Sequence, residues 1–265
     1  MLKDFTKEKF DIIILAGQSN AEGNGMGSVE KPYQPSDNVW FMRGPIDSHE
    51  YYLCPACEDV RENETISNFI LKFSENYIAD GRLSEGRKLL ILCAAVGGTG
   101  FLGNHWGLKD CYYLRMMDMI RTSLMLNAEN RLVGLIWHQG EYDACYDASL
   151  DVHYNHLDSL LKSVLDEFKV SDLPFVAGDF VHDWKSKNQA KCEPVVSAMR
   201  KLCGDYPFGA FVESDGLKSN HQELDRMTPV AGNYLIDDIH FSRKALYEFG
   251  ERYYNAFVSI LNKKN

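Results

Sequence analysis

Short apolar segments alternate with longer amphipathic segments along most of the chain. Five short runs are rich in branched apolar side chains, which is typical of strands buried in a parallel sheet. Between them, apolar residues recur at intervals of three and four, which indicates helices with one buried face. The expected strands cover residues 11–16, 88–94, 132–137, 174–178 and 209–213, and the expected helical faces run through residues 66–77, 113–124, 157–168 and 246–260.

This alternation predicts an α/β fold. We expect one domain over residues 1–265, built as a three-layer α/β/α sandwich around a doubly wound sheet of about five parallel strands. Ligands bind such sheets beyond the carboxyl ends of the strands, so a motif directly after a strand is a candidate functional site. The longest irregular stretch, residues 43–63, is interpreted as a loop over that site.

The overall charge narrows the choice of partners. The chain has 265 residues and a formal net charge of −10 without a basic stripe, so a nucleic-acid partner is not expected. The same charge disfavours a polyanionic substrate, although a local site can override the overall field. No apolar run is long enough to span a bilayer and no signal peptide is visible, so we expect no membrane partner and a cytoplasmic location.

The first candidate motif follows the expected strand at residues 11–16. It reads Gly17-Gln18-Ser19-Asn20, and Gly17 permits a tight turn that would place Ser19 at the start of the next helix. A serine at that position can cap the helix or act as a nucleophile. Taken alone, the cap is the more common role.

Two further motifs follow the expected strands at residues 88–94 and 132–137. In Gly97-Gly98-Thr99 the paired glycines let the backbone approach a ligand and offer it an N–H group, although a simple turn explains them in isolation. In the segment 139–143, the amide of Gln139 can donate to a developing oxyanion.

Two carboxylates of the same segment, Glu141 and Asp143, stand only two residues apart. A glycosidase needs its two carboxylates on opposite sides of a sugar, which this spacing does not favour. We therefore expect Glu141 and Asp143 to hold the surrounding loops by hydrogen bonds.

The fourth motif lies just before the last expected helix. His240 could act as a general base for a serine, and Asp237, three residues earlier, could orient its imidazole. Asp238 could compete for the orienting role. In isolation the segment reads as an Asp-rich helix start, but four such motifs at strand ends or helix starts make an esterase site the better interpretation.

A metal site is the competing interpretation. Cys54 and Cys57 have the spacing of zinc ligands, and His153 and His156 share one face of a helix, but no second ligand pair accompanies the cysteines. The seven cysteines are scattered and odd in number, which favours reduced thiols. We expect no bound metal.

The four motifs together resemble the SGNH-hydrolase superfamily, also called GDSL-like esterases. More narrowly, they resemble its carbohydrate-esterase branch, which includes sialate O-acetylesterase-like proteins and acetylxylan esterases. The motifs of that branch stand here at residues 17–20, 97–99, 139–143 and 237–240, in the same order. The resemblance implies a flavodoxin-like fold, no cofactor, a Ser19, His240 and Asp237 triad, and an oxyanion hole formed by the N–H groups of Ser19 and Gly98 and the side chain of Gln139, with Gly97 as the alternative to Gly98.

The expected activity is hydrolysis of short-chain esters, with acetyl implied by the resemblance, through an acyl-enzyme. The substrate would be a small-molecule or oligosaccharide ester, such as an O-acetylated sialic acid or xylo-oligosaccharide. A lipase or thioesterase with a longer acyl preference and a catalytically silent carbohydrate-binding relative are the alternatives. Candidate substrate or loop contacts are Gln18, Gly97, Trp106, Glu141 and Tyr142, with Trp40 and Trp184 as further aromatic faces.

Overall fold

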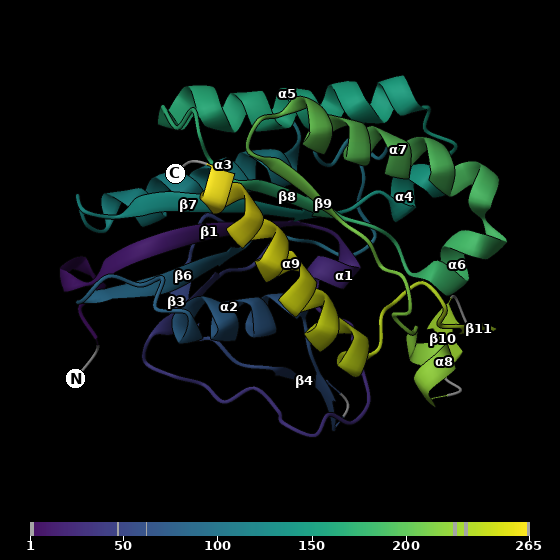
Figure 1. Cartoon of the computed structure of the whole chain (residues 1–265), viewed down its shortest axis with the longest axis horizontal. Helices are drawn as coiled ribbons and strands as arrows, with labels where there is room; N and C mark the ends of the chain where they lie inside the picture. The colour runs from purple at the N-terminus through teal and green to yellow at the C-terminus, as the bar shows by residue number, and fades with distance from the viewer. Residues whose placement is uncertain (1–2, 47, 62, 225–226, 231–232, 264–265) are drawn as a thin grey trace.

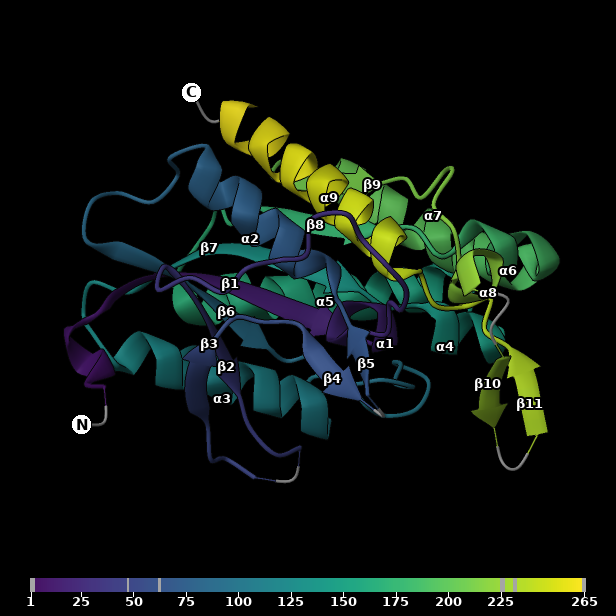
Figure 2. The ribbon, with the colours of Figure 1, turned by 90° about the horizontal axis from the view of Figure 1, so that it is seen from below.

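The protein is built around one large twisted sheet in the computed structural model (Figures 1 and 2). The structure describes residues 3–46, 48–61, 63–224, 227–230 and 233–263. The sheet has seven strands in the order β3-β2-β6-β1-β7-β8-β9, all parallel except β3, which pairs antiparallel with β2. Their bounds are β1 (Lys9–Gly17), β2 (Val39–Arg43), β3 (Tyr52–Pro55), β6 (Arg87–Cys93), β7 (Arg131–His138), β8 (Phe175–Gly178) and β9 (Gly209–Val212).

Helices cover both faces of this sheet. On one face α2 (Phe69–Ala79) packs against α9 (Arg243–Lys263), and α3 (Cys111–Met125), α5 (Leu150–Phe168) and α7 (Gln189–Asp205) lie on the other (Figures 1 and 2). Phe69 and Tyr253 stack with ring centroids 4.4 Å apart between α2 and α9. A Cβ at Gly250 would lie 2.2 Å from the Phe69 carbonyl oxygen, so this close approach requires glycine.

The centre of the sheet is buried on both sides because its strands are almost continuously apolar. In β1, Ile12, Ile13 and Ile14 are fully buried, and Ile13 lies opposite Ile91 of β6. Each buried side chain of this size contributes about 1.5–3 kcal/mol relative to exposure. The core therefore fixes the directions of β1, β6 and β7, and with them the positions of the loops that follow.

Most of the expected elements are confirmed. All five predicted strands and all four predicted helices are present, and the three-layer α/β arrangement with a mostly parallel sheet matches the expectation. Two strands of the seven-stranded sheet, β2 and β3, were not predicted, nor was the long helix α7, which contains Pro194. In addition, Ile66 belongs to a short strand and not to the helix that starts at Phe69.

The interpretation of residues 43–63 as an irregular loop is only partly right. The segment contains two short strands: β3 closes one side of the sheet with Phe41 opposite Cys54, and β4 (Asp59–Arg61) pairs with β5 (Glu64–Ile66). This segment forms part of a cavity wall, as described below. The remaining short elements are the 3-10 turn Phe5–Lys7, α1 (Ser19–Glu22), α4 (Glu141–Cys145), α6 (His182–Lys187), α8 (Asn220–Leu224), β10 (Met227–Val230) and β11 (Asn233–Ile236).

The candidate motifs meet at the carboxyl ends of the central strands. The loops after β1, β6 and β7 leave these ends, and the segment before α9 returns to the same edge of the sheet (Figure 1). Within the described residues, none of the helices combines the length and apolar character that crossing a membrane would require.

Candidate active site

Ser19 is the first residue of α1 and lies directly beyond the end of β1. Gly17 makes this turn possible, because its φ is +131° and a Cβ there would lie 2.0 Å from the His138 carbonyl oxygen. Gln18, not Ser19, occupies the helix-cap position, and it makes no side-chain cap bond. The Ser19 hydroxyl is therefore not used as a cap and remains available to other partners.

The hydroxyl of Ser19 is part of a hydrogen-bonded chain of three side chains. His240 Nε2 lies 3.0 Å from Ser19 Oγ, and His240 Nδ1 lies 2.7 Å from Asp237 Oδ1. Because an ionised carboxylate can only accept, it favours the tautomer in which Nδ1 carries the proton and Nε2 accepts from the serine. The geometry thus matches a nucleophile, a base and an orienting acid in series.

The structure also separates the two neighbouring aspartates. Asp237 faces His240, whereas Asp238 accepts a hydrogen bond from Lys187 Nζ at 3.0 Å. The second carboxylate oxygen of Asp237 accepts from Asn220 Nδ2 at 2.9 Å. Asn220 was not identified from the sequence, because it belongs to α8, outside all four motifs.

Asn20 connects the loop of the serine with the loop of the histidine. Its Nδ2 donates to Glu141 Oε1 at 2.9 Å and to the Ile239 carbonyl at 3.0 Å, and its Oδ1 accepts the N–H of Phe241 at 3.1 Å. Burial opposes ionisation of Glu141, but the nearby His138, whose Nε2 lies 3.4 Å from Glu141 Oε1, and the hydrogen bond from Asn20 outweigh it and lower the pKa of this carboxyl. Glu141 is fully buried, so it anchors these loops and does not reach a substrate.

The backbone N–H groups of Ser19 and Gly98 have no acceptor among the described residues. The N–H of Gly97 is already used, because it donates to Glu22 Oε2 at 2.8 Å. Gly97 nonetheless lies against the nucleophile, since a Cβ on it would lie 3.6 Å from Ser19 Cβ. Of the two glycines considered, Gly98 is the one with a free N–H.

Gln139 is placed differently from the prediction. Its side chain is fully buried, and its Nε2 donates to the Thr99 carbonyl at 3.2 Å and to Asp143 Oδ2 at 2.9 Å. These two acceptors use both amide hydrogens and fix the orientation of the amide, which leaves no N–H for an oxyanion. Gln139 instead ties the residue after Gly98 to the 139–143 segment.

Asp143 carries out the loop-holding role expected of it. It accepts the backbone N–H groups of Phe101 and Leu102 at 3.1 and 2.9 Å, in addition to the Gln139 amide. Burial opposes ionisation of Asp143, but contacts with His153, Leu102 and Gln139 outweigh it and lower the pKa of the carboxyl. The loop after β6 is therefore fixed by a buried carboxylate from the loop after β7.

Of the aromatic side chains considered as stacking faces for a sugar, the three tryptophans are buried, and Trp106 contacts a loop instead. Trp106 is fully buried and donates from Nε1 to Thr99 Oγ1 at 2.9 Å, and Trp40 and Trp184 are also buried in the core. Tyr142 is the exception: it is half-buried and stacks on Tyr146, with ring centroids 4.6 Å apart. Tyr142 is joined to the nucleophile loop because its N–H donates to Gln18 Oε1 at 3.2 Å.

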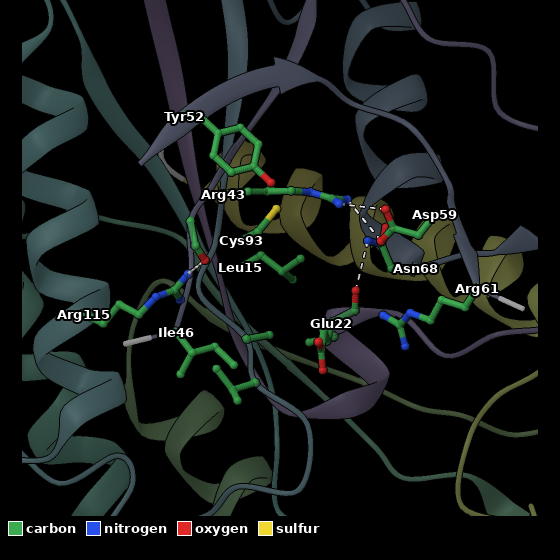
Figure 3. Close-up of a pocket in the computed structure, with 14 residues that line it drawn as sticks. Leu15, Glu22, Arg43, Ile46, Tyr52, Asp59, Arg61, Asn68, Cys93 and Arg115 are labelled. Atoms are coloured by element: carbon green, nitrogen blue, oxygen red, sulfur yellow. Dashed lines mark hydrogen bonds and ion pairs between the residues drawn. The ribbon is translucent and has the colours of Figure 1, made fainter. Parts of the chain in front are cut away.

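A cavity of about 220 Å³ adjoins α1, the short helix that starts at Ser19; Ser19 itself is not among the residues that line it (Figure 3). Ala21 and Glu22 of α1 form one wall and Val96, next to Gly97, forms another. The residues expected to form an irregular loop supply a further wall through β2, β3 and β4.

Metal-ligating side chains are not clustered in the described part of the chain. No three or more His, Cys, Asp or Glu side chains within those residues are arranged to hold an ion. Cys54 and Cys57 are free thiols, and burial raises the pKa of Cys54.

A family model for carbohydrate esterases described as sialic acid-specific acetylesterases matches residues 9–259. The chain belongs to this family. It is 29% identical over 87 residues to an Escherichia coli (strain K12) protein described as "Probable 9-O-acetyl-N-acetylneuraminic acid deacetylase". That match covers 30% of this chain and only 27% of the relative.

Solved structures agree with the fold of this family member. The crystal structure of NanS superposes with a TM-score of 0.77 at 16% identity, covering 97% of this chain and 99% of that one. A protein from Arabidopsis thaliana superposes with a TM-score of 0.69 at 18% identity, covering 94% of this chain and 98% of that one. At these identities the likeness supports the fold alone.

Proposed function

We propose that this chain is a serine esterase that removes acetyl groups from an O-acetylated carbohydrate. The observation that carries the proposal is the series of contacts from Asp237 through His240 to Ser19, at 2.7 and 3.0 Å. These distances lie within hydrogen-bond reach, which is what a serine needs for activation by a neighbouring base.

In the proposed first step, Ser19 Oγ attacks the acetyl carbonyl while His240 Nε2 takes its proton. Asp237 stabilises the imidazolium that forms. Collapse of the tetrahedral intermediate breaks the bond to the sugar oxygen, which receives the proton from His240. Water, deprotonated by the same imidazole, then attacks the acetyl-enzyme, acetate leaves, and Ser19 regains its proton.

The negative charge on the carbonyl oxygen would be stabilised by the free backbone N–H groups of Ser19 and Gly98. Loss of one such donor typically slows a reaction about 100- to 1,000-fold. Gln139 and Asp143 would keep Gly98 in place, because Gln139 donates to both Asp143 and the carbonyl of Thr99, the residue after Gly98.

A sialic acid is the sugar that the family description and the name of the Escherichia coli relative favour. The cavity that adjoins α1 supports a polar substituent there, because arginines line it together with apolar residues. This lining favours an acetylated sugar over a long-chain acyl ester or a thioester. Comparing kcat/KM for acetyl and octanoyl esters tests that preference.

The proposal is tested by Ser19→Ala, with Ser259→Ala as the matched control. Ser259 is exposed on α9 and its hydroxyl donates only to the Ala256 carbonyl of the same helix. Release of acetate from p-nitrophenyl acetate and from an O-acetylated sialic acid should fall at least about 1,000-fold in Ser19→Ala, and should persist in Ser259→Ala. Unchanged hydrolysis by a folded Ser19→Ala protein would rule out the proposed mechanism.

A further inference from the structure

Three arginines, Arg43, Arg61 and Arg115, line the cavity that adjoins α1 (Figure 3). The lining contains two carboxylates, Glu22 and Asp59. This local excess of positive charge stands out in a chain with a net charge of −10. A site of this kind can attract an anion in spite of the overall negative field.

Of the two carboxylates, only Asp59 is paired with an arginine in the described part of the chain. Asp59 receives two hydrogen bonds from Arg43, at 2.7 and 3.3 Å, and Glu22 accepts the backbone N–H of Gly97. Arg61 donates to the neutral side chain of Asn24 at 3.1 Å. Arg43 is therefore neutralised by its partner, whereas Arg61 and Arg115 remain, against the one lining carboxylate, Glu22, that has no arginine partner among the described residues.

Arg115 is the decisive residue. It reaches the cavity from α3, and only 6% of it is exposed. Its one hydrogen bond is to the Gly44 carbonyl at 3.0 Å, and its buried Nε has no partner. No carboxylate among the described residues lies within 4.0 Å of its nitrogens; Asp118, on the same helix, instead contacts His49 and Tyr51.

A guanidinium that is nearly fully desolvated without a counter-charge is costly. Within the described residues no negative charge offsets the desolvation free energy of Arg115, so a bound anion would lower the free energy of the site. Among organic anions, a carboxylate matches the planar donor edge of arginine and can accept two parallel hydrogen bonds.

The position of the cavity indicates that the anion would be part of the ester substrate. Ala21 and Glu22 lie within one helical turn of Ser19, and Val96 adjoins Gly97, which touches Ser19. A group bound among these residues would belong to the molecule whose ester reaches the nucleophile. The small volume, about 220 Å³, suits a substituent of one sugar.

We propose that Arg115, assisted by Arg61 at the cavity wall, binds the carboxylate of the substrate and makes the enzyme specific for acetylated sugar acids over neutral acetylated sugars. This inference rests on the proposed esterase function and adds the residue that distinguishes a charged substrate from a neutral one. A sialic acid carries such a carboxylate, whereas a xylo-oligosaccharide does not.

The first experiment compares an O-acetylated sialic acid with its carboxamide, which keeps the acetyl ester but lacks the charge. Wild-type kcat/KM should favour the acid by about 10- to 100-fold, the worth of one charge-assisted hydrogen bond. Arg115→Met should abolish that ratio, and Arg115→Lys should retain part of it. Arg121→Met is the matched control, because Arg121 lies on the same helix but pairs with Glu167 on the surface.

A wild-type enzyme that treats the two substrates equally would overturn the proposal, as would an Arg115→Met protein that keeps the wild-type ratio. An equal loss on both substrates would also contradict it, because that result indicates a structural role for Arg115.

The second experiment measures binding without turnover, which separates this inference from the esterase proposal. The Ser19→Ala protein should bind the acetylated acid about 10- to 100-fold more tightly than the carboxamide by calorimetry. Adding Arg115→Met should remove the difference. Equal affinities in Ser19→Ala would sink the carboxylate site, whereas persistent hydrolysis by Ser19→Ala would sink only the proposed mechanism.

Discussion

The side-chain carbonyl of Asn20 accepts the backbone N–H of Phe241 at 3.1 Å. Asn20 follows Ser19 and Phe241 follows His240, so this bond ties together the two segments that must place a hydroxyl and an imidazole in contact. The Nδ2 group of Asn20 adds a second tie to the same segment through the Ile239 carbonyl.

Asn20→Ala should therefore lower kcat more than it raises KM. Small misplacement of reacting groups can cost about 100-fold in rate, and we expect a loss of about 10- to 100-fold here. The rate at which Ser19 reacts with a fluorophosphonate should fall in parallel. Asn127→Ala, which removes a surface amide bonded to Thr6, serves as the control. An unchanged kcat in Asn20→Ala would show that the two segments need no such tie.

Asp237 and Asp238 offer a comparison between adjacent residues of the same type. Asp237→Asn should reduce kcat by about 10,000-fold, because the amide no longer stabilises the imidazolium or holds its tautomer. Asp238→Asn loses a surface contact with Lys187 and should retain nearly full activity. Steady-state kinetics on p-nitrophenyl acetate measure both. A larger loss in Asp238→Asn would reverse the proposed roles.

The parts of the fold that could be predicted were those buried on both sides. The strands β1, β6 and β7 are continuous apolar runs because helices cover both of their faces. β3 was missed because it is an edge strand, in which Tyr52 is exposed and Leu53 and Cys54 are only half-buried. α7 was missed because Pro194 lies inside it and interrupts the helical pattern.

Residues of the candidate site could be predicted only where they belong to a short sequence motif. Ser19 and His240 stand in recognisable patterns, and the structure brings them within 3.0 Å. The partners of a side chain are not visible in a sequence, which is why Gln139 was given a donor role that its contacts do not allow. Asn220 and Arg115 belong to no motif, and their significance depends on burial and on residues distant in the chain.

Gln139 provides a test of loop anchoring against direct catalysis. Gln139→Ala should lower the free energy of unfolding by about 2 kcal/mol, because it leaves the buried Thr99 carbonyl without a donor. The loss in kcat should be smaller than the 100- to 1,000-fold that is typical when an oxyanion donor is removed. Urea unfolding and kinetics on the same protein supply both numbers. A large loss in kcat with unchanged stability would instead support the original donor role.

The buried Asp143 carboxylate should make stability depend on pH in the acid range. Its pKa is lowered below 3.8 in the folded protein, so between the folded and unfolded values the unfolded chain binds more protons. The stabilisation is thus fully present above the unfolded value and is lost as the pH falls through the folded one. Glu141, whose pKa is lowered from 4.5, acts in the same direction.

Asp143→Asn should therefore be less stable than wild type near neutral pH, by about 3 kcal/mol, since an amide cannot satisfy the N–H groups of Phe101 and Leu102 together with Gln139. The difference should shrink as the pH falls below 3.8, because the unfolded wild-type chain then binds a proton that the folded protein binds only at lower pH. Urea unfolding of both proteins from neutral pH to about pH 3 measures this convergence. A difference that stays constant over the whole range would mean that the charge of Asp143 does not stabilise the loop, and that only its shape and hydrogen bonds do.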